Sequence, residues 1–91
     1  MHVPTDPPPD WILRWRRDIG TRVRDLRMDR NLTQEGLAGR IGAERRTIYR
    51  IEQGMHSPSL DRLLQIARAL HVAPSALMPD SPLDPTGPRE A

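Results

Sequence analysis

Cysteine, lysine and phenylalanine are absent from this chain of 91 residues, and its aromatic residues are limited to two Trp and one Tyr. Without cysteine there can be neither a disulfide framework nor a thiolate metal site. A hydrophobic content of 36% with so few aromatic rings argues against a large core or a deep substrate pocket. No apolar run approaches the ~20 residues of a membrane span, and the first ten residues lack the basic and apolar stretches of a signal peptide. We therefore expect a small soluble cytoplasmic protein that uses no metal, cofactor or membrane.

Positive charge is concentrated in the middle of the chain. Residues 11–78 contain thirteen Arg and seven acidic residues, a net charge of +6, whereas residues 1–10 and 79–91 each carry −2. All 14 basic residues are Arg, which is better suited than Lys to bidentate contacts with phosphate and guanine. The coding bias of a GC-rich genome also explains a lack of lysine. It leaves the central excess of positive charge unexplained.

Proline divides the chain into a central domain and two tails. Four prolines lie in residues 1–9 and four more in residues 79–91, and segments of this composition bury too little apolar surface to become ordered. We therefore predict disordered, flexible tails at 1–9 and 79–91 and one folded domain at 10–78. Apolar residues spaced by three and four predict helices at about 10–30, 34–41, 45–53, 60–70 and 74–78, and no stretch alternates as a strand does. The expected fold is all-α with five helices.

Particular residues predict where these helices begin, end and face the core. Asp10, Thr33 and Ser59 are predicted N-caps, and Asn31 and His71 are expected to end the first and fourth helices because both residue types tolerate a positive φ. The apolar residues expected to face the core are Ile12, Trp15, Ile19, Val23 and Leu26 in the first helix, Leu37, Ala38 and Ile41 in the second, Ile48 and Ile51 in the third, Leu60, Leu63, Leu64, Ala67 and Leu70 in the fourth, and Ala76, Leu77 and Met78 in the fifth.

Residues 32–54 contain two short helical patterns joined by a glycine. Ala38 is small enough for the two helices to cross closely, and Gly42 allows a sharp turn that a side chain would strain. Ile48 and Ile51 are expected to anchor the second helix so that its polar side projects outward. Gly36 and Gly39 each weaken the first of these helices by about 1 kcal/mol relative to Ala, so that helix depends on packing. This pattern is typical of a helix-turn-helix.

Three longer motifs occur together across residues 17–78. They are Leu-Thr-Gln-x-x-Leu-Ala at 32–38, Thr-Ile-x-Arg-Ile-Glu-x-Gly at 47–54, and Pro-Ser-Leu-x-x-Leu-x-x-Ile-Ala-x-Ala-Leu at 58–70. In their joint spacing they resemble the lambda-repressor/Cro-type helix-turn-helix family, often called the XRE family. The resemblance implies a compact lambda-repressor-like DNA-binding domain, here with an N-terminally extended first helix.

The resemblance also implies a role for individual residues. Side chains implied to read DNA bases are Arg45, Arg46, Tyr49 and Arg50. Residues implied to contact DNA phosphates are Arg27, Thr33, Gln34, His56 and Ser57. Residues implied to support the motif are Ala38, Gly42, Ile48, Ile51, Glu52 and Gly54, with an ion pair between Arg27 and Glu52. Glu44 departs from the Ser or Thr common at its position, and it either pairs with Arg45 or accepts a hydrogen bond from a cytosine amino group.

Two surfaces are candidates for a dimer interface. Trp11 and Trp15 lie one helical turn apart on the extension of the first helix, where they either cover the far end of the core or contact another subunit. The resemblance points instead to the fifth helix and its flanks, with Val72, Leu77 and Met78. The sequence does not decide between these surfaces.

The sequence thus predicts a regulator of transcription that binds double-stranded DNA sequence-specifically, of bacterial or phage type. We expect a homodimer that acts as a repressor, inserts helix 45–53 into the major groove, and is associated with the nucleoid when bound to DNA. One alternative is an antitoxin or adaptor that binds a protein partner through the tails or the Trp face and keeps a DNA-binding module. Another is a nucleoid protein indifferent to sequence. No enzyme is expected, because there is no clustered His, phosphate-binding glycine loop or pair of carboxylates in a cleft.

Overall fold

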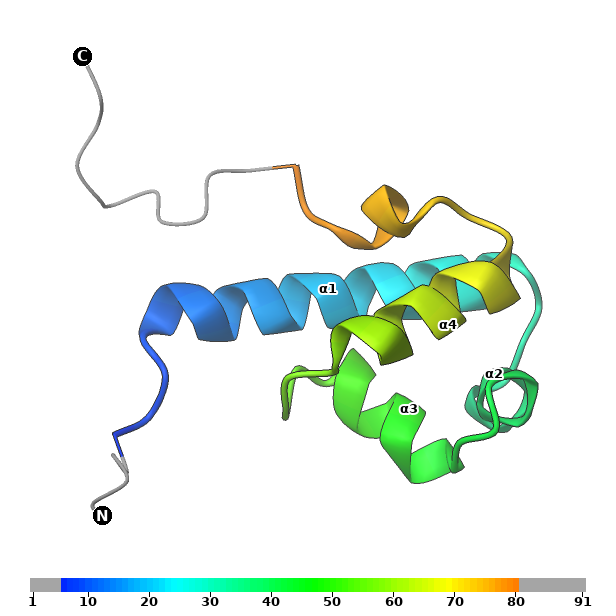
Figure 1. Ribbon diagram of the computed structural model, residues 1–91, viewed down its shortest axis with the longest axis horizontal. Coiled ribbons are helices and arrows are strands. Elements are labelled where there is room, and N and C mark those ends of the chain that lie inside the picture. Colours follow the sequence, from blue (N-terminus) through cyan, green and yellow to red (C-terminus); the bar gives the residue numbers. More distant parts are fainter. Residues whose placement is uncertain (1–5, 81–91) are drawn as a thin grey trace.

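The computed structural model describes residues 6–80, which form helices joined by short loops (Figure 1). Its elements are α1 (Asp10–Asp29), α2 (Gln34–Arg40), α3 (Arg45–Glu52), α4 (Leu60–Leu70) and the 3₁₀ helix η1 (Pro74–Leu77). No strand occurs among the described residues, so the predicted all-α class is confirmed. The tails predicted to be disordered lie largely outside the described residues. None of the described helices is long and apolar enough to cross a lipid bilayer.

The fifth predicted helix, at about 74–78, is present as the 3₁₀ helix η1, so the described residues contain four α-helices and one 3₁₀ helix. Its hydrogen bonds run from Ala76 N–H to Ala73 O at 2.9 Å and from Met78 N–H to Ser75 O at 3.1 Å, which is the i to i+3 pattern. Four residues beginning at Pro74 offer few amides for an α-helical ladder. η1 therefore covers the core with one short turn, from which Leu77 is buried.

Local signals placed most helix ends correctly. The Thr33 hydroxyl accepts a hydrogen bond from Gly36 N–H at 2.9 Å, and the Ser59 hydroxyl accepts one from Arg62 N–H at 3.1 Å. Asn31 and His71 end their helices at φ 58° and 57°. The prediction for Asp10 is wrong, because Pro9 is the N-cap of α1 and Asp10 is the first helical residue. The Asp10 carboxylate still lies where the helix dipole favours negative charge.

One apolar core holds the helices together. Its buried members are Val23, Leu37, Ala38, Ile48, Ile51, Leu63, Ile66, Ala67, Leu70 and Leu77. In α4 the predicted inner face is partly wrong, since Leu60 is 68% exposed and Leu64 is 42% exposed, whereas Ile66 is fully buried. The buried stripe is Leu63, Ile66, Ala67 and Leu70, and Leu64 lies about 100° round the helix from Leu63.

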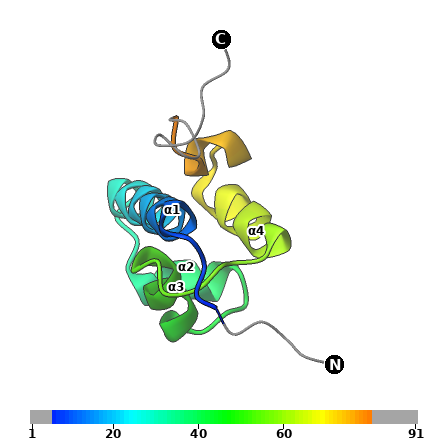
Figure 2. The ribbon, with the colours of Figure 1, turned by 90° about the vertical axis from the view of Figure 1, so that its left-hand side faces the viewer.

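α1 is longer than the body it packs on. It lies against α3, η1 and α4 (Figure 2), and its N-terminal end extends past the other helices (Figure 1). Core contacts begin at Ile19 and continue through Val23 and Leu26, whereas Ile12 and Trp15 are not among the residues that pack on the core. The expected apolar stripe of α1 therefore meets the core only along its C-terminal half. The two Trp residues do not cover the end of the core.

Candidate nucleic-acid interface

α2 and α3 form a bent pair of short helices. α2 begins after the Thr33 cap and ends at Arg40, and the chain turns through Gly42 at φ 68°. Ala43 N–H donates to Ala38 O at 2.9 Å, which closes the turn. Ala38 is 2% exposed where the helices pack together. The pair has the geometry of a helix-turn-helix.

α3 has one buried side and one exposed side. Ile48 and Ile51 are 0% and 1% exposed and fix the helix to the core. The opposite side carries Arg45, Arg46, Tyr49 and Arg50, all of them exposed. Because an α-helix turns 100° per residue, anchoring positions 48 and 51 fixes the direction in which the other four side chains leave the protein.

The three exposed guanidinium groups of α3 differ in their partners. Arg45 Nη1 donates to Gln34 Oε1 at 3.2 Å, and Arg46 Nη2 lies 3.5 Å from Glu44 Oε2. The Arg50 guanidinium makes no hydrogen bond or ion pair with any described residue. The expected pairing of Glu44 with Arg45 is wrong, since Glu44 contacts Arg46 instead. That contact is long and lies between side chains that are 65% and 78% exposed, so it holds Arg46 only weakly.

A buried polar network joins α1, α2 and α3 beneath this surface. Arg27 Nε donates to Glu52 Oε2 at 2.6 Å, and Arg27 Nη2 donates to Glu52 Oε1 at 3.0 Å. Gln34 Nε2 also donates to Glu52 Oε1, at 3.1 Å. The Glu52 side chain is 1% exposed, so its charge is balanced almost entirely by these partners. The network ends at the surface, where Gln34 accepts from Arg45.

These contacts change the expected role of Arg27. Its third nitrogen, Nη1, donates to Leu32 O at 2.7 Å, and the side chain is only 11% exposed. Three of its five N–H donors are thus bound inside the protein, and the side chain is too little exposed to reach a phosphate easily. Arg27 therefore fits the group of supporting residues. Gln34 is half-buried, and both ends of its amide are engaged, one with Glu52 and one with Arg45.

The loop between α3 and α4 lies against α1. It follows Gly54, which has a φ of 69°, and includes half-buried His56 and exposed Ser57. A Cβ at Gly54 would lie 2.8 Å from Arg17 Cγ, so α1 passes close to this loop. Thr33, at the start of α2, is also exposed. Thr33, His56 and Ser57 thus remain within reach of solvent.

Three residues important to this arrangement were not predicted as site or support residues. Gly20 lies where α1 crosses the end of α3, and a Cβ there would lie 2.3 Å from Ile51 O. Arg30 Nε donates to Leu70 O, and Arg40 Nη1 donates to Ala69 O at 3.2 Å, so both arginines bind carbonyls at the end of α4. A glycine inside a strong helical pattern was the one available signal for Gly20. Nothing in the sequence links either arginine to residues about thirty to forty positions away.

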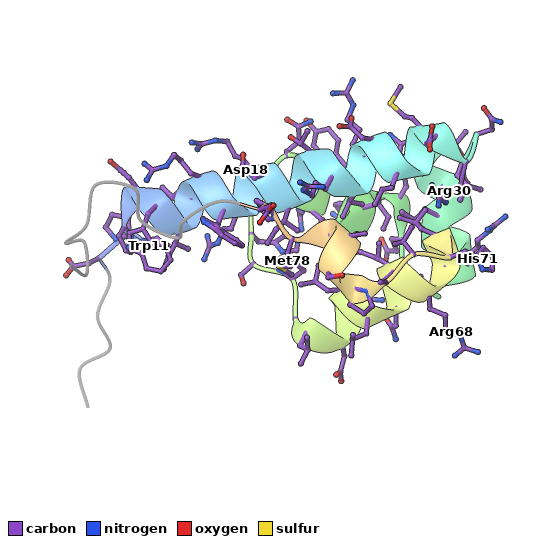
Figure 3. The ribbon with its side chains drawn as sticks, turned by 90° about the horizontal axis from the view of Figure 1, so that it is seen from above. Trp11, Asp18, Arg30, Arg68, His71 and Met78 are labelled. Carbon is purple, nitrogen blue, oxygen red and sulfur yellow. The ribbon has the colours of Figure 1, made fainter. Side chains whose placement is uncertain are left out.

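The two candidate dimer surfaces differ in what they expose. Leu77 is 0% exposed, so the proposal that it contacts a second subunit is wrong, because its side chain fills the core. Val72 and Met78 are partly exposed and pack against the edge of the core. Trp11 and Trp15 are half-buried and lie on the free end of α1, where Figure 3 labels Trp11.

Comparison with known proteins supports the same interpretation of the geometry. A family model described as a helix-turn-helix domain matches residues 18–79. The chain belongs to this helix-turn-helix family. An uncharacterised HTH-type transcriptional regulator of Methanothermobacter thermautotrophicus is 50% identical over 50 residues, which is 55% of this chain and 72% of that relative.

Solved structures of helix-turn-helix proteins share the fold. The restriction-modification controller protein C.AhdI from Aeromonas hydrophila has a TM-score of 0.67 and 35% identity, covering 68% of this chain and 90% of that one. The P22 c2 repressor in complex with a synthetic operator has a TM-score of 0.62 and 27% identity, covering 66% and 91%. The resemblance to the lambda-repressor/Cro type is confirmed. The helix-turn-helix match begins at residue 18, so Trp11 and Trp15 lie outside it.

Proposed function

We propose that this helix-turn-helix protein binds double-stranded DNA as a transcriptional regulator, acts as a repressor, and places α3 in the major groove. The proposal rests on the two sides of α3. Ile48 and Ile51 are buried, whereas the side that carries the arginines is exposed to solvent. Arg46 and Arg50 would read bases, since a guanidinium binds guanine O6 and N7 in a bidentate manner. Tyr49, which is 43% exposed, would contact a thymine methyl or a phosphate.

In this proposal Gln34 and Arg45 act together. Gln34 is held from below by Glu52 and itself holds Arg45 at 3.2 Å. Arg45 would therefore meet DNA with fewer free rotamers than Arg50, which has no partner among the described residues. A group whose orientation is fixed before binding loses less entropy on binding. Arg45 is expected to contribute a base or phosphate contact in a defined direction.

Phosphate contacts would set the register of α3 in the groove. We assign them to Thr33 and Gln34 at the start of α2 and to His56 and Ser57 before α4. Such contacts orient a protein on the duplex without reading sequence. Arg27 supports the motif from inside, because its nitrogens are already bound.

The protein is proposed to act as a homodimer on an operator with two-fold symmetry. A two-fold dimer would use the same patch on both subunits, and the partly exposed Val72 and Met78 beside η1 form such a patch. For helix-turn-helix dimers in general, half-sites lie about 34 Å apart, one turn of DNA.

The experiment that tests this function is selection of bound sequences from random duplex DNA, followed by affinity measurements on the selected site. Arg46→Ala should weaken binding by about 1–3 kcal/mol and relax the preference at one base position. Arg24→Ala is the matched control, because Arg24 is an exposed arginine on α1 whose loss removes the same charge. It should leave the base preference unchanged.

Two results would contradict the proposal. An equal loss of affinity for Arg46→Ala on every sequence would mean that Arg46 does not read a base. Failure of the selection to enrich any sequence, with binding that stays tight, would indicate a protein that coats DNA without reading it.

A further inference from the structure

Two exposed arginines of α1 lie on either side of the end of α3. α1 crosses α3 at Gly20, where an added Cβ would collide with the backbone of Ile51 and Glu52. Arg17 precedes Gly20 by three residues, and Arg24 follows it by four. Because α1 rises about 1.5 Å per residue, these arginines are about 10.5 Å apart along the helix, with the end of α3 between them.

The direction of both side chains follows from the turn of the helix. Val23 is fully buried in the core, and Gly20 touches α3. Each step of three residues back along α1 turns about 60° in the same sense, so Val23, Gly20 and Arg17 point in turn to the core, to the end of α3 and to the outside. Arg24 lies about 20° round the helix from Arg17. Both arginines therefore emerge beside α3 on the side away from the core, where α3 exposes its own arginines.

The loop after α3 packs against Arg17. A Cβ at Gly54 would lie 2.8 Å from Arg17 Cγ and 2.9 Å from its Cα, so the loop passes directly over this arginine. The same loop continues to His56 and Ser57, the two residues before α4 that are proposed to contact phosphates. Arg17 thus lies next to the part of the proposed DNA surface that meets the backbone of the duplex.

The charges of Arg17 and Arg24 are not balanced by the rest of the described chain. Neither side chain takes part in a hydrogen bond or an ion pair within residues 6–80. Asp18 and Asp25 follow them directly in the sequence, but each lies about 100° round the helix from its neighbouring arginine. These two carboxylates line a depression that they share with Asp80, on another edge of α1. The N–H donors of both guanidinium groups are therefore available to a ligand.

We propose that Arg17 and Arg24 bind phosphates of the DNA backbone on either side of the C-terminal end of α3. The inference rests on the proposed function, in which α3 lies in the major groove. A recognition helix contacts bases with its N-terminal residues, so its C-terminal end, with α1 across it, lies further out and beside the sugar-phosphate backbone. A guanidinium binds a phosphate through two parallel N–H bonds. Two such contacts about 10.5 Å apart fix the angle of α3 in the groove without reading sequence.

The test measures how the DNA affinity of the full chain depends on salt. Each phosphate that a protein cation neutralises contributes about 0.9 to the slope of log K against log salt concentration. Arg17→Gln/Arg24→Gln should therefore lower that slope by about 1.8, so that between about 50 and 200 mM salt the unchanged chain loses about twelvefold more affinity than the variant. The variant should bind the selected operator and an unrelated duplex more weakly by the same factor, and its base preference should not change.

Two further variants control for charge and for folding. Arg22→Gln/Arg68→Gln removes two exposed arginines from depressions that no residue of α3 lines, and it should keep the slope of the unchanged chain. Arg17→Lys/Arg24→Lys keeps both charges at the end of α3 and should restore most of the slope, since lysine also binds phosphate. Urea unfolding should give all three variants the stability of the unchanged chain, because the substituted side chains are exposed.

An unchanged slope in Arg17→Gln/Arg24→Gln would overturn the inference, and so would an equal reduction in Arg22→Gln/Arg68→Gln. A loss of affinity confined to the selected operator would also overturn it, because phosphates are common to every sequence. The proposed function is judged separately. If selection enriches an operator whose base preference Arg46→Ala relaxes, α3 reads DNA whether or not the salt slope responds to Arg17 and Arg24.

Discussion

Glu52 shows how one buried charge can position a surface that it never reaches. It accepts from Arg27 on α1 and from Gln34 on α2 while belonging to α3 itself, so three helices meet at one carboxylate. Through Gln34 its effect extends to Arg45 at the proposed DNA surface. The resemblance implied the pair of Arg27 with Glu52 but gave Arg27 a phosphate to bind. Only the geometry shows that three of the five N–H donors of this arginine are bound inside the protein and that its side chain is 11% exposed.

Removing this carboxylate should therefore cost far more than removing an exposed one. Glu52→Ala leaves the Arg27 guanidinium buried without a counter-charge, and we expect it to lower the free energy of unfolding by about 3–5 kcal/mol. Glu44→Ala breaks the exposed contact with Arg46 and should change that free energy by less than about 1 kcal/mol. Urea unfolding followed by circular dichroism measures both.

If Glu52→Ala proves too unstable to purify, Glu52→Gln keeps the shape and removes the charge, and it should fall between the two. A network without energetic importance would give Glu52→Ala and Glu44→Ala similar stabilities. That result would also remove the basis for treating Arg45 as positioned before binding.

At the level of elements, the sequence predicted what depends on neighbours in the chain. The four α-helices, the Thr33 and Ser59 caps, and the left-handed residues Asn31 and His71 all follow from local residue preferences. What it did not predict depends on partners far away. Leu60 and Leu64 fit a helical apolar pattern, yet no other element covers them. The α4 carbonyls held by Arg30 and Arg40 likewise depend on packing that no local pattern encodes.

The site follows the same division. The exposure of Arg45, Arg46 and Arg50 was predictable, because the anchoring positions Ile48 and Ile51 are on the same short helix. The pairing of Glu44 with Arg46 was not, since either neighbour satisfies the sequence. The backbone contact at Gly20 was not predicted either, because the partner carbonyl belongs to residue 51, on another helix.

Two glycines that look alike in the sequence should respond oppositely to alanine. Gly20→Ala places a Cβ 2.3 Å from Ile51 O, so α1 and α3 must move apart, and we expect a loss of at least about 1–3 kcal/mol of stability. A Cβ at Gly39 meets nothing within 4 Å, so Gly39→Ala should instead stabilise α2 by up to about 1 kcal/mol.

Thermal unfolding of the two variants beside the unchanged chain checks this pair. The melting temperature should fall for Gly20→Ala and rise for Gly39→Ala. If both variants melted at a higher temperature, α1 would not cross α3 as closely as the contact between Gly20 and Ile51 O requires.

In the whole molecule, the basic side of α3 and the acidic edge of α1 lie on different surfaces. The arginine side of α3 is exposed, and the opposite edge of α1 carries Asp18, Arg22 and Asp25 together with Asp80, a net charge of −2. An acidic edge remote from a basic face orients the protein as it approaches a polyanion. The surface proposed for a second subunit is the one around η1, where Val72 and Met78 are partly exposed.

If the dimer forms through η1, substituting an exposed residue of η1 should weaken both dimerisation and operator binding. Val72 and Met78 pack on the core, so substituting them would confuse dimerisation with unfolding. Ser75 is exposed on η1 between them. In a two-fold interface, Ser75→Glu brings two carboxylates together near the axis, and desolvating like charges there should weaken the dimer.

Sedimentation should then show Ser75→Glu as a folded monomer at concentrations where the unchanged chain is dimeric. Binding to a full operator should weaken, whereas binding to a single half-site should be unaffected, because α3 is untouched. Gln65→Glu adds the same charge on the exposed side of α4 and should leave both the mass and the operator affinity as they were. A Ser75→Glu variant that stayed dimeric and bound the operator normally would place the two-fold axis on another surface.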